Sequence, residues 1–476
     1  MDIRILIDLG STYTKVLAVD LDQEVLVGRA QALTTVATDI SIGLSEAYFT
    51  LIAECGIDEK DIRGRYASSS AAGGLRMAAI GLVPSLTLEA ARRAALGAGA
   101  KVVSAYGFKI YSDIVLELEE ASCDIILLTG GTDGGDTEVI LHNARMLADS
   151  RLSCPILVAG NRVASEQVKS ILQGKGKTVA VTQNVLPSLE AVEVGPVQAL
   201  IRDIFIAQIT DAKGLTSARE FIHNEIVPTP KATLQAAALL ADGTSEERGI
   251  GTLAIVEVGG ATTNIHSVCS GTPSDPQTLV RGLPEPRVKR TVEGDLGIRY
   301  NAPTIYELMG EEHGETRLRA IHRFSNADAI ELEEHIAALS ADVGYVPEDT
   351  LTFDVDILLA EYATSVAMQR HAGTLREEYS VVGKIKVQTG KNLLDIENLI
   401  GTGGIFKYGR HPERILQAAQ FSLDSPWSLK PKTPKTFIDC EYFLYAIGLL
   451  AEHFPTKALR IAKKYLQPIS IDSFVA

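Results

Sequence analysis

Hydrophobic and polar positions along this chain form the same short pattern at two widely separated places. Residues 5–20 read ILIDLGSTYTKVLAVD, and residues 254–268 read AIVEVGGATTNIHSV. In each copy an apolar run reaches an acidic residue, a turn of small residues follows, and a second apolar run begins. Apolar runs rich in Ile, Leu and Val on both sides of a Gly-containing turn are typical of β-hairpins. The pattern therefore predicts two hairpins of one kind, each with a carboxylate just before its turn.

Elsewhere, apolar runs of strand length alternate with helical patterns, which is typical of an α/β fold. Residues 24–33 extend the first predicted hairpin by a third strand. Two strand–turn–helix steps, at 124–147 and 154–172, predict a small doubly wound sheet whose ligands would lie at the carboxyl ends of the strands. The other predicted elements are a helix at 41–55, a strand at 64–69, a helix at 86–99, strands at 101–110 and 177–185, helices at 195–245 with a break at 226–230, a helical and acidic stretch at 304–380, and helices at 440–466 broken near Pro455.

Composition narrows the possible functions. The chain has 476 residues, 46% of them hydrophobic, which suffices for several domains with large cores. Its formal net charge of −15 argues against nucleic-acid partners and against a basic membrane-binding surface. No apolar run reaches the roughly 18–20 residues of a membrane span. The five cysteines are scattered without a C-x-x-C pair, which indicates free thiols in a reducing compartment. We therefore expect a cytoplasmic protein with no nucleic-acid or membrane partner.

The first hairpin carries the groups that a nucleoside triphosphate needs. Phosphates are bound by hydroxyl groups and by backbone N–H groups, which approach closely where a glycine stands. A cation offsets the remaining charge, and carboxylates hold Mg²⁺, usually through water. Asp8 would face the Mg²⁺, and Lys15 would supply the cation. The residues predicted to face the phosphates are Gly10, Ser11 and Thr12. The alternative is an ordinary hairpin with a hydroxyl-rich turn and a solvated lysine.

Two later segments complete a nucleotide-binding set. The second hairpin repeats the order of acid, glycines and hydroxyls, with Glu257 in the place of the acid. Its predicted phosphate-binding residues are Gly259, Gly260, Thr262 and Thr263. A third glycine-rich turn lies between an apolar run and a helix, where the chain could pass close to a flat adenine ring. Its glycines are Gly401, Gly403 and Gly404.

Together, and in this order, the three elements resemble those of the actin-like ATPase superfamily. The resemblance implies two RNase-H-like lobes that hold ATP and Mg²⁺ in a cleft. It implies that Asp8 and Glu257 are the catalytic carboxylates, which hold the Mg²⁺ through water. It also implies that the hairpin turns are two phosphate loops and that the third turn is the adenosine motif.

A closer resemblance covers nearly the whole chain. It rests on the segments LLTGGTDGGDTE (127–138), VEVGGATTNIHSV (256–268), KRTVEGDLG (289–297), QRHAG (369–373) and IGTGGIFKYG (400–409). These look like the glutamate-mutase-associated MutL/GlmL family, which is distinct from the mismatch-repair MutL. The resemblance implies an ATP-dependent reactivating chaperone that exchanges damaged cobalamin for intact coenzyme in an adenosylcobalamin-dependent aminomutase. Its partners would be the mutase subunits.

The expected fold is therefore α/β, with two RNase-H-like lobes, an inserted small α/β unit and a helical C-terminal segment. The expected boundaries are a first lobe at 1–112, the insert at 113–190, a helical connector at 191–250, a second lobe at 251–410 with an acidic helical subregion near 304–380, and the C-terminal helical segment at 411–476.

Two positions depart from the superfamily pattern. The second phosphate loop usually opens with Asp, where this chain has Glu257, and usually ends with Asp, where it has Asn264. A longer carboxylate can still reach a metal through water, whereas the missing charge at position 264 would weaken metal binding or slow hydrolysis. We therefore expect a weak ATPase, and we expect Asn264→Asp to raise its hydrolysis rate.

The segment 129–138 fits two interpretations. Asp133, Asp136 and Glu138 could supply oxygen ligands to a further anion or metal site. Equally, the segment could be a strand-to-helix turn whose Asp and Thr residues cap the helix. His142 and His266 raise the idea of a cobalt ligand, but no D-x-H-x-x-G cobalamin-binding signature occurs. We therefore expect both to be ordinary structural histidines.

Two other functions are compatible with a two-lobed ATP-binding fold. A small-molecule kinase needs an Asp placed as the base for a substrate hydroxyl, and no clear sugar-kinase signature surrounds such an Asp here. A filament-forming actin homologue needs uniform repeated lobes, which the inserted unit at 113–190 disrupts. The kinase is the stronger of these two alternatives.

Overall fold

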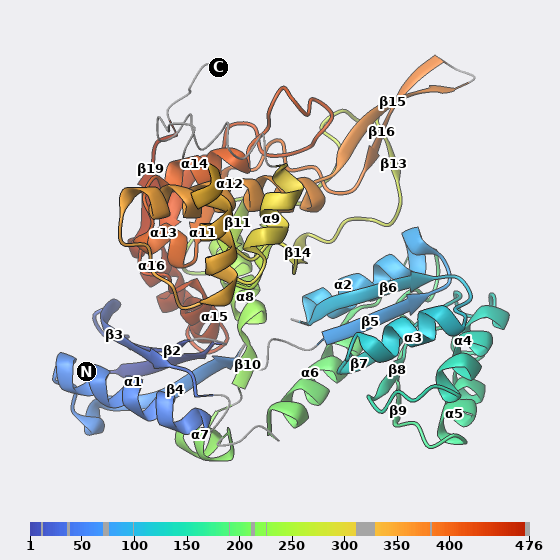
Figure 1. Ribbon diagram of the computed structural model, residues 1–476, viewed down its shortest axis with the longest axis horizontal. Coiled ribbons are helices and arrows are strands. Elements are labelled where there is room, and N and C mark those ends of the chain that lie inside the picture. The colour runs from blue at the N-terminus through green and yellow to red at the C-terminus, as the bar shows by residue number, and fades with distance from the viewer. Residues whose placement is uncertain are drawn as a thin grey trace. The chain divides into compact units, whose positions relative to one another are not determined.

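The fold is that of a computed structural model of the chain (Figure 1). The described residues are 1–10, 13–35, 39–69, 76–98, 100–189, 191–210, 215–224, 226–310, 329–380 and 383–471. Ser11 and Thr12, two predicted phosphate-binding residues, lie outside them, as does the stretch 311–328 of the predicted acidic helical region. The first of two compact units comprises Met1–Asp20, Val27–Lys231 and Gly282–Pro284. The second comprises Leu21–Leu26, Ala232–Arg281 and Glu285–Ala476.

The first predicted hairpin lies within a five-stranded sheet of the first unit. The strands of this sheet are β1 (Ile3–Leu9), β2 (Tyr13–Asp20), β3 (Val25–Leu33), β4 (Ile62–Ser69) and β10 (Ile226–Pro228). Their order is β10–β4–β1–β2–β3. Strands β1 and β2 form the antiparallel hairpin, whereas β1, β4 and β10 are parallel neighbours. The carboxyl ends of β1, β4 and β10 therefore meet at one edge of the sheet.

The first unit contains a second sheet, in which all five strands are parallel. Its strands are β5 (Arg76–Gly81), β6 (Lys101–Gly107), β7 (Ile125–Leu128), β8 (Ile156–Val158) and β9 (Val179–Val181). Their order is β6–β5–β7–β8–β9, so the direction of winding reverses between β5 and β7. Ligands of doubly wound sheets bind beyond the carboxyl ends of the strands at such a reversal. The segment 129–138 directly follows β7 and lies at this position.

The second unit repeats the arrangement of the first sheet. Its main strands are β11 (Leu253–Val258), β12 (Thr263–Val268), β14 (Val288–Glu293), β17 (Asn398–Thr402), β18 (Lys435–Asp439) and β19 (Leu466–Ile469). Their order is β14–β12–β11–β17–β18–β19. Strands β11 and β12 form the second predicted hairpin, and β11, β17 and β18 are parallel. Apart from β19, this is the order of the first sheet. The expected α/β fold with two lobes of one type is confirmed.

The remaining elements are a small sheet and the helices. A small sheet consists of β13 (Leu279–Arg281), β15 (Thr374–Ser380) and β16 (Gly383–Thr389), and the β15–β16 hairpin is drawn in orange in Figure 1. The helices are α1 (Ile40–Cys55), α2 (Glu89–Gly97), α3 (Ser112–Glu120), α4 (Glu138–Ala148), α5 (Ser165–Gln173), α6 (Gly195–Thr210), α7 (Leu215–Ile222), α8 (Thr229–Asp242), α9 (Ala302–Met309), α11 (Ala329–Ala341), α12 (Thr350–His371), α13 (Gly404–Tyr408), α14 (Pro412–Ala418), α15 (Leu444–Ala451) and α16 (Pro455–Tyr465), with short turns of helix at Glu59–Asp61 and Pro84–Leu88. Among the described helices, none is both long and apolar enough to cross a membrane.

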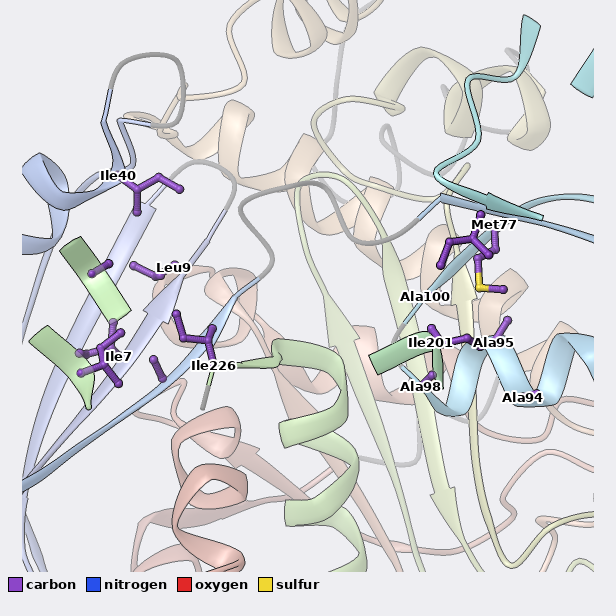
Figure 2. Packing of buried hydrophobic residues seen from close by; sticks show 14 of the residues in the cluster. Ile7, Leu9, Ile40, Met77, Ala94, Ala95, Ala98, Ala100, Ile201 and Ile226 are labelled. Atoms are coloured by element: carbon purple, nitrogen blue, oxygen red, sulfur yellow. The ribbon is translucent and has the colours of Figure 1, made fainter. Parts of the chain in front are cut away.

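Buried aliphatic side chains hold the sheets of the first unit to their helices. Figure 2 shows Ile7 and Leu9 of β1 together with Ile226 of β10, and all three are at most 2% exposed. In the second sheet, Met77 of β5 is buried beside the alanine-rich helix α2. The small alanine side chains let α2 lie close to both β5 and α6, because no bulky group separates them.

Several expected boundaries differ from the structure. The small parallel sheet begins with β5 rather than at residue 113, because β5 pairs with β7. The expected connector at 191–250 contains β10, where Pro228 is tolerated as the last residue of an edge strand. The helical stretch expected at 304–380 ends in β15, and the C-terminal segment at 411–476 contributes β18 and β19 to the main sheet. These boundaries are set by strand pairing between distant segments, which local periodicity does not reveal.

Candidate functional site

In the first unit, Asp8 is the penultimate residue of β1 and is held by three side chains. Its Oδ1 accepts hydrogen bonds from the hydroxyl groups of Thr229 at 2.7 Å and Ser68 at 3.2 Å. Its Oδ2 accepts from Nζ of Lys15, the residue directly opposite on β2, at 3.3 Å. The Asp8 side chain is only 4% exposed. Groups from β2, β4 and α8 therefore fix the direction of this carboxylate.

The turn of the first hairpin requires its glycine. The N–H of Gly10 donates to the carbonyl of Tyr13 at 3.2 Å. A Cβ on Gly10 would lie 2.5 Å from that carbonyl oxygen, so a larger residue would open the turn. The structure thus places Asp8, Gly10 and Lys15 at one end of the hairpin, as the sequence predicts.

In the second unit, Glu257 is the penultimate residue of β11 and takes the place that Asp8 has in β1. Directly opposite on β12 is Asn264, whose Nδ2 donates to Oε2 of Glu257 at 3.1 Å. Nε2 of His266 lies 3.1 Å from the same oxygen. Lys15 and Asn264 therefore occupy equivalent positions, and each donates to the carboxylate across its hairpin.

Arg290 adds a buried positive charge to the Glu257 cluster, because it is the neighbour of His266 on β14. Burial would raise the pKa of Glu257, but the hydrogen bonds from His266 and Asn264 and the charge of Arg290 lower it overall. Burial lowers the pKa of His266, and Arg290 lowers it further, against the opposing effect of Glu257. Burial lowers the pKa of Arg290 to about 10. At neutral pH the cluster therefore combines an ionised carboxylate, a neutral imidazole and a guanidinium.

This geometry reverses the expected effect of an acid at position 264. In Asn264→Asp, a second carboxylate would face Glu257 in place of an amide that donates a hydrogen bond. Like charges directly opposite each other on a hairpin are destabilising. We expect the substitution to lower the free energy of unfolding of the second unit by about 1–2 kcal/mol and not to raise hydrolysis. The single tryptophan, Trp427, lies in this unit, so its fluorescence during unfolding by urea provides the measurement.

The double variant Glu257→Gln with Asn264→Asp is the matched control for this prediction. In it the new amide at position 257 can donate a hydrogen bond to the new carboxylate at position 264. It should recover most of the lost stability. A single variant Asn264→Asp that is as stable as the wild-type protein would contradict the assignment of this hydrogen bond.

The second turn is closed by its own backbone and by one buried hydroxyl. The N–H of Gly259 donates to the carbonyl of Thr262 at 3.0 Å. Thr263 is fully buried, and its hydroxyl donates to the carbonyl of Leu296 at 2.6 Å. The hydroxyl of Thr263 thus holds the turn to Leu296, which lies just after β14 near the end of the KRTVEGDLG motif singled out in the sequence.

Gly260 of this turn is anchored through its carbonyl and offers a backbone N–H group. Its carbonyl accepts from the N–H groups of Arg299 and Tyr300 at 2.9 and 3.0 Å. Arg299 is itself held by Asp356 of α12, at 2.8 and 2.7 Å. Among the residues that the structure describes, none accepts a hydrogen bond from the N–H of Gly260. The turn is therefore rigidly anchored and presents a free N–H group.

The three glycines after β17 have different roles. A Cβ on Gly401 would lie 2.3 Å from the ring of Phe406. Gly403 has a φ of 117°, and its Cβ would lie 2.3 Å from the carbonyl oxygen of Val258, at the end of β11. Gly404 starts α13, and a Cβ there would meet none of the described atoms within 4 Å. Gly401 thus makes room for the ring of Phe406 in α13, Gly403 lets the turn pack against the end of β11, and Gly404 faces open space.

Two alanine substitutions separate these roles. Gly403→Ala should destabilise the second unit by about 2–4 kcal/mol, because it combines an unfavourable φ with a backbone clash. Gly404→Ala should leave the stability unchanged, since alanine suits a helix start and meets open space. It should weaken nucleotide binding if the adenosine lies there. Trp427 fluorescence and ATP calorimetry measure the two effects, and equal stability of the two variants would contradict this assignment.

Asp439 is a buried acid beside the third glycine turn that sequence reasoning missed. It ends β18 and is fully buried. Its Oδ2 accepts from the hydroxyl of Thr402 at 2.8 Å and from the N–H groups of Phe443 and Leu444 at 2.8 and 3.0 Å. Burial raises the pKa of Asp439 to about 6, against these hydrogen bonds. The available signal was an apolar strand that ends in an acid, as in both hairpins.

The raised pKa gives Asp439 a predictable effect on stability. The native state binds more protons than the unfolded chain between pH 3.8 and about 6, so this group's contribution to stability falls as pH rises through that range. Asp439→Asn keeps the acceptor oxygen and removes the buried charge. We expect it to raise the free energy of unfolding by about 1–2 kcal/mol at pH 8 and by nearly nothing at pH 4. Urea unfolding at both pH values measures this, and an equal gain at both would contradict it.

Each acid of the segment 129–138 interacts with a different part of the protein. Oδ1 of Asp133 accepts from the N–H of Arg162 and from Nδ2 of Asn184, both at 2.9 Å. Asp136 accepts from the N–H of Val139 in the first turn of α4, and Glu138 forms an ion pair with Lys109. Within the described residues, no group of three His, Cys, Asp or Glu side chains is arranged to hold a metal ion. The structure favours the interpretation as a capped strand-to-helix turn.

The two candidate cobalt-ligating histidines also have structural partners. Nε2 of His142 lies 2.9 Å from the carbonyl oxygen of Ile110, and the ring makes an edge contact with Tyr111. His266 lies against Glu257, as described above. Both therefore have the protein contacts expected of structural histidines.

The two hairpins offer groups that suit a magnesium nucleotide. Each presents carboxylate oxygens, which are the ligands that Mg²⁺ prefers. The first hairpin adds the ammonium of Lys15, and the second adds the N–H of Gly260, and both kinds of group bind phosphate. The residues present therefore match Mg²⁺ and a triphosphate in chemical kind.

Comparisons with known proteins agree with the resemblance found in the sequence. The model of a protein family described as MutL protein matches residues 4–466. Protein MutL of Clostridium tetanomorphum is 44% identical over 466 residues, which cover 98% of this chain and 99% of that protein.

Solved structures show more distant likeness. The activator of the 2-hydroxyisocaproyl-CoA dehydratase from Clostridium difficile, with bound ADPNP, is 9% identical and aligns over 97% of this chain and 96% of its own, with a TM-score of 0.32. A glycerol dehydratase reactivase is 12% identical over 94% of this chain and 99% of its own, with a TM-score of 0.34. The family match and the 44% identical relative both span nearly the whole chain, and they show that it belongs to the MutL protein family.

Proposed function

We propose that this chain binds Mg²⁺·ATP through its two glycine-turn hairpins and reactivates an adenosylcobalamin-dependent aminomutase of the glutamate-mutase type in the cytoplasm. The proposal that the chain binds a nucleotide rests on one observation. Two sheets of the same strand order each place a carboxylate one residue before the end of a central strand, opposite a hydrogen-bond donor and beside a glycine turn. One such hairpin is an ordinary turn, whereas a pair offers two sets of carboxylates and donors to a magnesium triphosphate.

Each hairpin would contribute a distinct part of the site. Asp8 and Glu257 would hold Mg²⁺ through water, and Lys15 would offset the charge of the phosphates. The N–H of Gly260 would donate to a phosphate oxygen. The open space at Gly404 would accept the adenosine.

Hydrolysis in such a site depends on position and charge rather than on a strong base. Water would attack the γ-phosphate in line with the leaving oxygen, and Mg²⁺, when bound, would supply charge compensation for the phosphates. The two carboxylates keep their directions through hydrogen bonds, so little reorganisation accompanies the reaction. Slow turnover would suit a chaperone, because ATP hydrolysis would then time a change of conformation.

The partner part of the proposal rests on family membership. The motifs of the sequence resemble the glutamate-mutase-associated MutL/GlmL family, and the family match supports that resemblance. Reactivation would consist of the release of damaged cobalamin from the mutase and the entry of intact coenzyme.

A reactivation assay tests the proposed function. A cobalamin-dependent aminomutase is inactivated with bound hydroxocobalamin and is then incubated with this chain, ATP, Mg²⁺ and adenosylcobalamin, while mutase activity is followed. We expect recovery that requires ATP and Mg²⁺ and is absent with the variant Asp8→Asn. Full recovery without ATP, or no recovery with any combination, would contradict the proposal. ATP consumption that depends on a small metabolite and yields its phosphate ester would instead establish a kinase.

A further inference from the structure

The carboxylate of Glu257 is held through one of its two oxygens. Both Asn264 and His266 donate to Oε2, each at 3.1 Å. Side chains two residues apart on a strand lie on the same face, which is why both reach the same oxygen. Among the described residues, the hydrogen bonds to this carboxylate are these two, and neither reaches Oε1. The carboxylate as a whole is 13% exposed, so Oε1 is the oxygen left for a ligand.

A comparison of the two hairpins shows that His266 is the additional group. In the first hairpin the shorter Asp8 is held by Lys15 and by hydroxyl groups from β4 and α8. Leu17 occupies the position that corresponds to His266, two residues after the opposing donor, and it is apolar and buried. The second hairpin has a glutamate, with one more rotatable bond, and a histidine donor where the first has none.

The state of the imidazole suits this task. His266 is fully buried, and its Nδ1 has no hydrogen-bond partner among the described residues. A single proton on Nε2 satisfies the contact with Oε2 of Glu257. His266 therefore restricts the carboxylate without competing for the ligand.

We propose that His266 is a positioning residue that fixes Oε2 of Glu257, so that Oε1 is directed toward the Mg²⁺ of bound Mg²⁺·ATP. This inference rests on the proposed nucleotide site. The imidazole touches neither ligand; it removes the extra freedom that glutamate has over aspartate. It thereby lets the longer acid serve at a position where aspartate is usual in the superfamily.

A matched pair of substitutions tests the role of His266. In His266→Gln the amide nitrogen can take the place of Nε2, whereas in His266→Asn the shorter side chain falls short of Glu257. ATP binding is measured by calorimetry over a series of Mg²⁺ concentrations and again in EDTA. We expect His266→Asn to need roughly tenfold more Mg²⁺ for half-maximal binding, as loss of a group behind a metal ligand typically causes. His266→Gln should stay near the wild-type value, and binding in EDTA should be the same in all three proteins.

A double-mutant cycle separates positioning from a general effect on the fold. In the background of Glu257→Gln, the substitution His266→Asn should cause no further rise in the Mg²⁺ requirement, because the carboxylate that it positions is gone. Equal Mg²⁺ requirements in wild type and His266→Asn, or additive effects of the two substitutions, would overturn the inference. If the wild-type chain binds no ATP at any Mg²⁺ concentration, the proposed function itself fails, and that outcome is distinct from the first two.

Discussion

Replacing Asp8 with asparagine is expected to lower Mg²⁺-dependent ATP turnover by about 100-fold. Asparagine keeps the size of the side chain and an oxygen that can accept from Ser68 and Thr229. It loses the negative charge that would hold Mg²⁺, and its amide group would face the ammonium of Lys15. Turnover is measured by phosphate release at saturating ATP, and circular dichroism shows whether the fold is kept.

Asp20→Asn is the matched control for this experiment. Asp20 is also a buried aspartate of the same hairpin, at 2% exposure, but it lies at the opposite end of β2. Its substitution should leave turnover close to the wild-type value. If Asp8→Asn turns over ATP as fast as Asp20→Asn, Asp8 is not part of the ATP site.

Lys391→Met is expected to lower the free energy of unfolding of the second unit by about 3 kcal/mol. Lys391 is fully buried, and its Nζ donates to the carbonyls of Arg287 at 2.8 Å, Pro286 at 2.9 Å and Ser267 at 3.4 Å. Methionine fills a similar volume but leaves three buried carbonyls without this donor. The cost of unsatisfied acceptors outweighs the gain from removing a buried charge.

The matched control for Lys391 is Lys430→Met, and urea unfolding followed by Trp427 fluorescence compares the two. Lys430 is also buried, at 4% exposure, but its described acceptor is a single carbonyl, that of Ala418 at 3.3 Å. Its substitution should cost about 1 kcal/mol. An equal loss in the two variants would show that burial of the stem, rather than the set of carbonyls, explains the role of Lys391.

The pKa of Lys391 adds a pH dependence to this comparison. Burial lowers the pKa from its ordinary value of 10.5 to about 8. Between these values the unfolded chain binds more protons than the native state, so this group's contribution to stability rises with pH. The difference between wild type and Lys391→Met should therefore be larger at pH 9.5 than at pH 7.

The sequence predicted the two hairpins well because their signals are local. Apolar runs, a glycine turn and a preceding acid fix the strand ends, so Asp8 and Glu257 fall where expected. Strand order could not be predicted in this way, because β10 and β18 join their sheets from distant parts of the chain. A Pro-containing segment such as 226–230 indicates a break by itself, and only its pairing with β4 makes it a strand.

The surroundings of the carboxylates could not be predicted for a related reason. His266 was expected to be structural, and its contact with Glu257 depends on the cross-strand register of β11 and β12. The superfamily pattern has an acid where this chain has Asn264, and only the register shows that the amide of Asn264 lies opposite an existing carboxylate. Lys391 follows a Thr-Gly pair that suggests a surface turn, yet carbonyls from two other segments enclose it.

Calorimetric titration of ATP in the presence of Mg²⁺ tests most directly the claim that the two hairpins serve one nucleotide. The account predicts one ATP per chain, and it predicts that Asp8→Asn in the first unit and Glu257→Gln in the second each weaken binding by at least about tenfold. Wild-type affinity in either variant, or two ATP molecules per chain with each variant losing one, would contradict it.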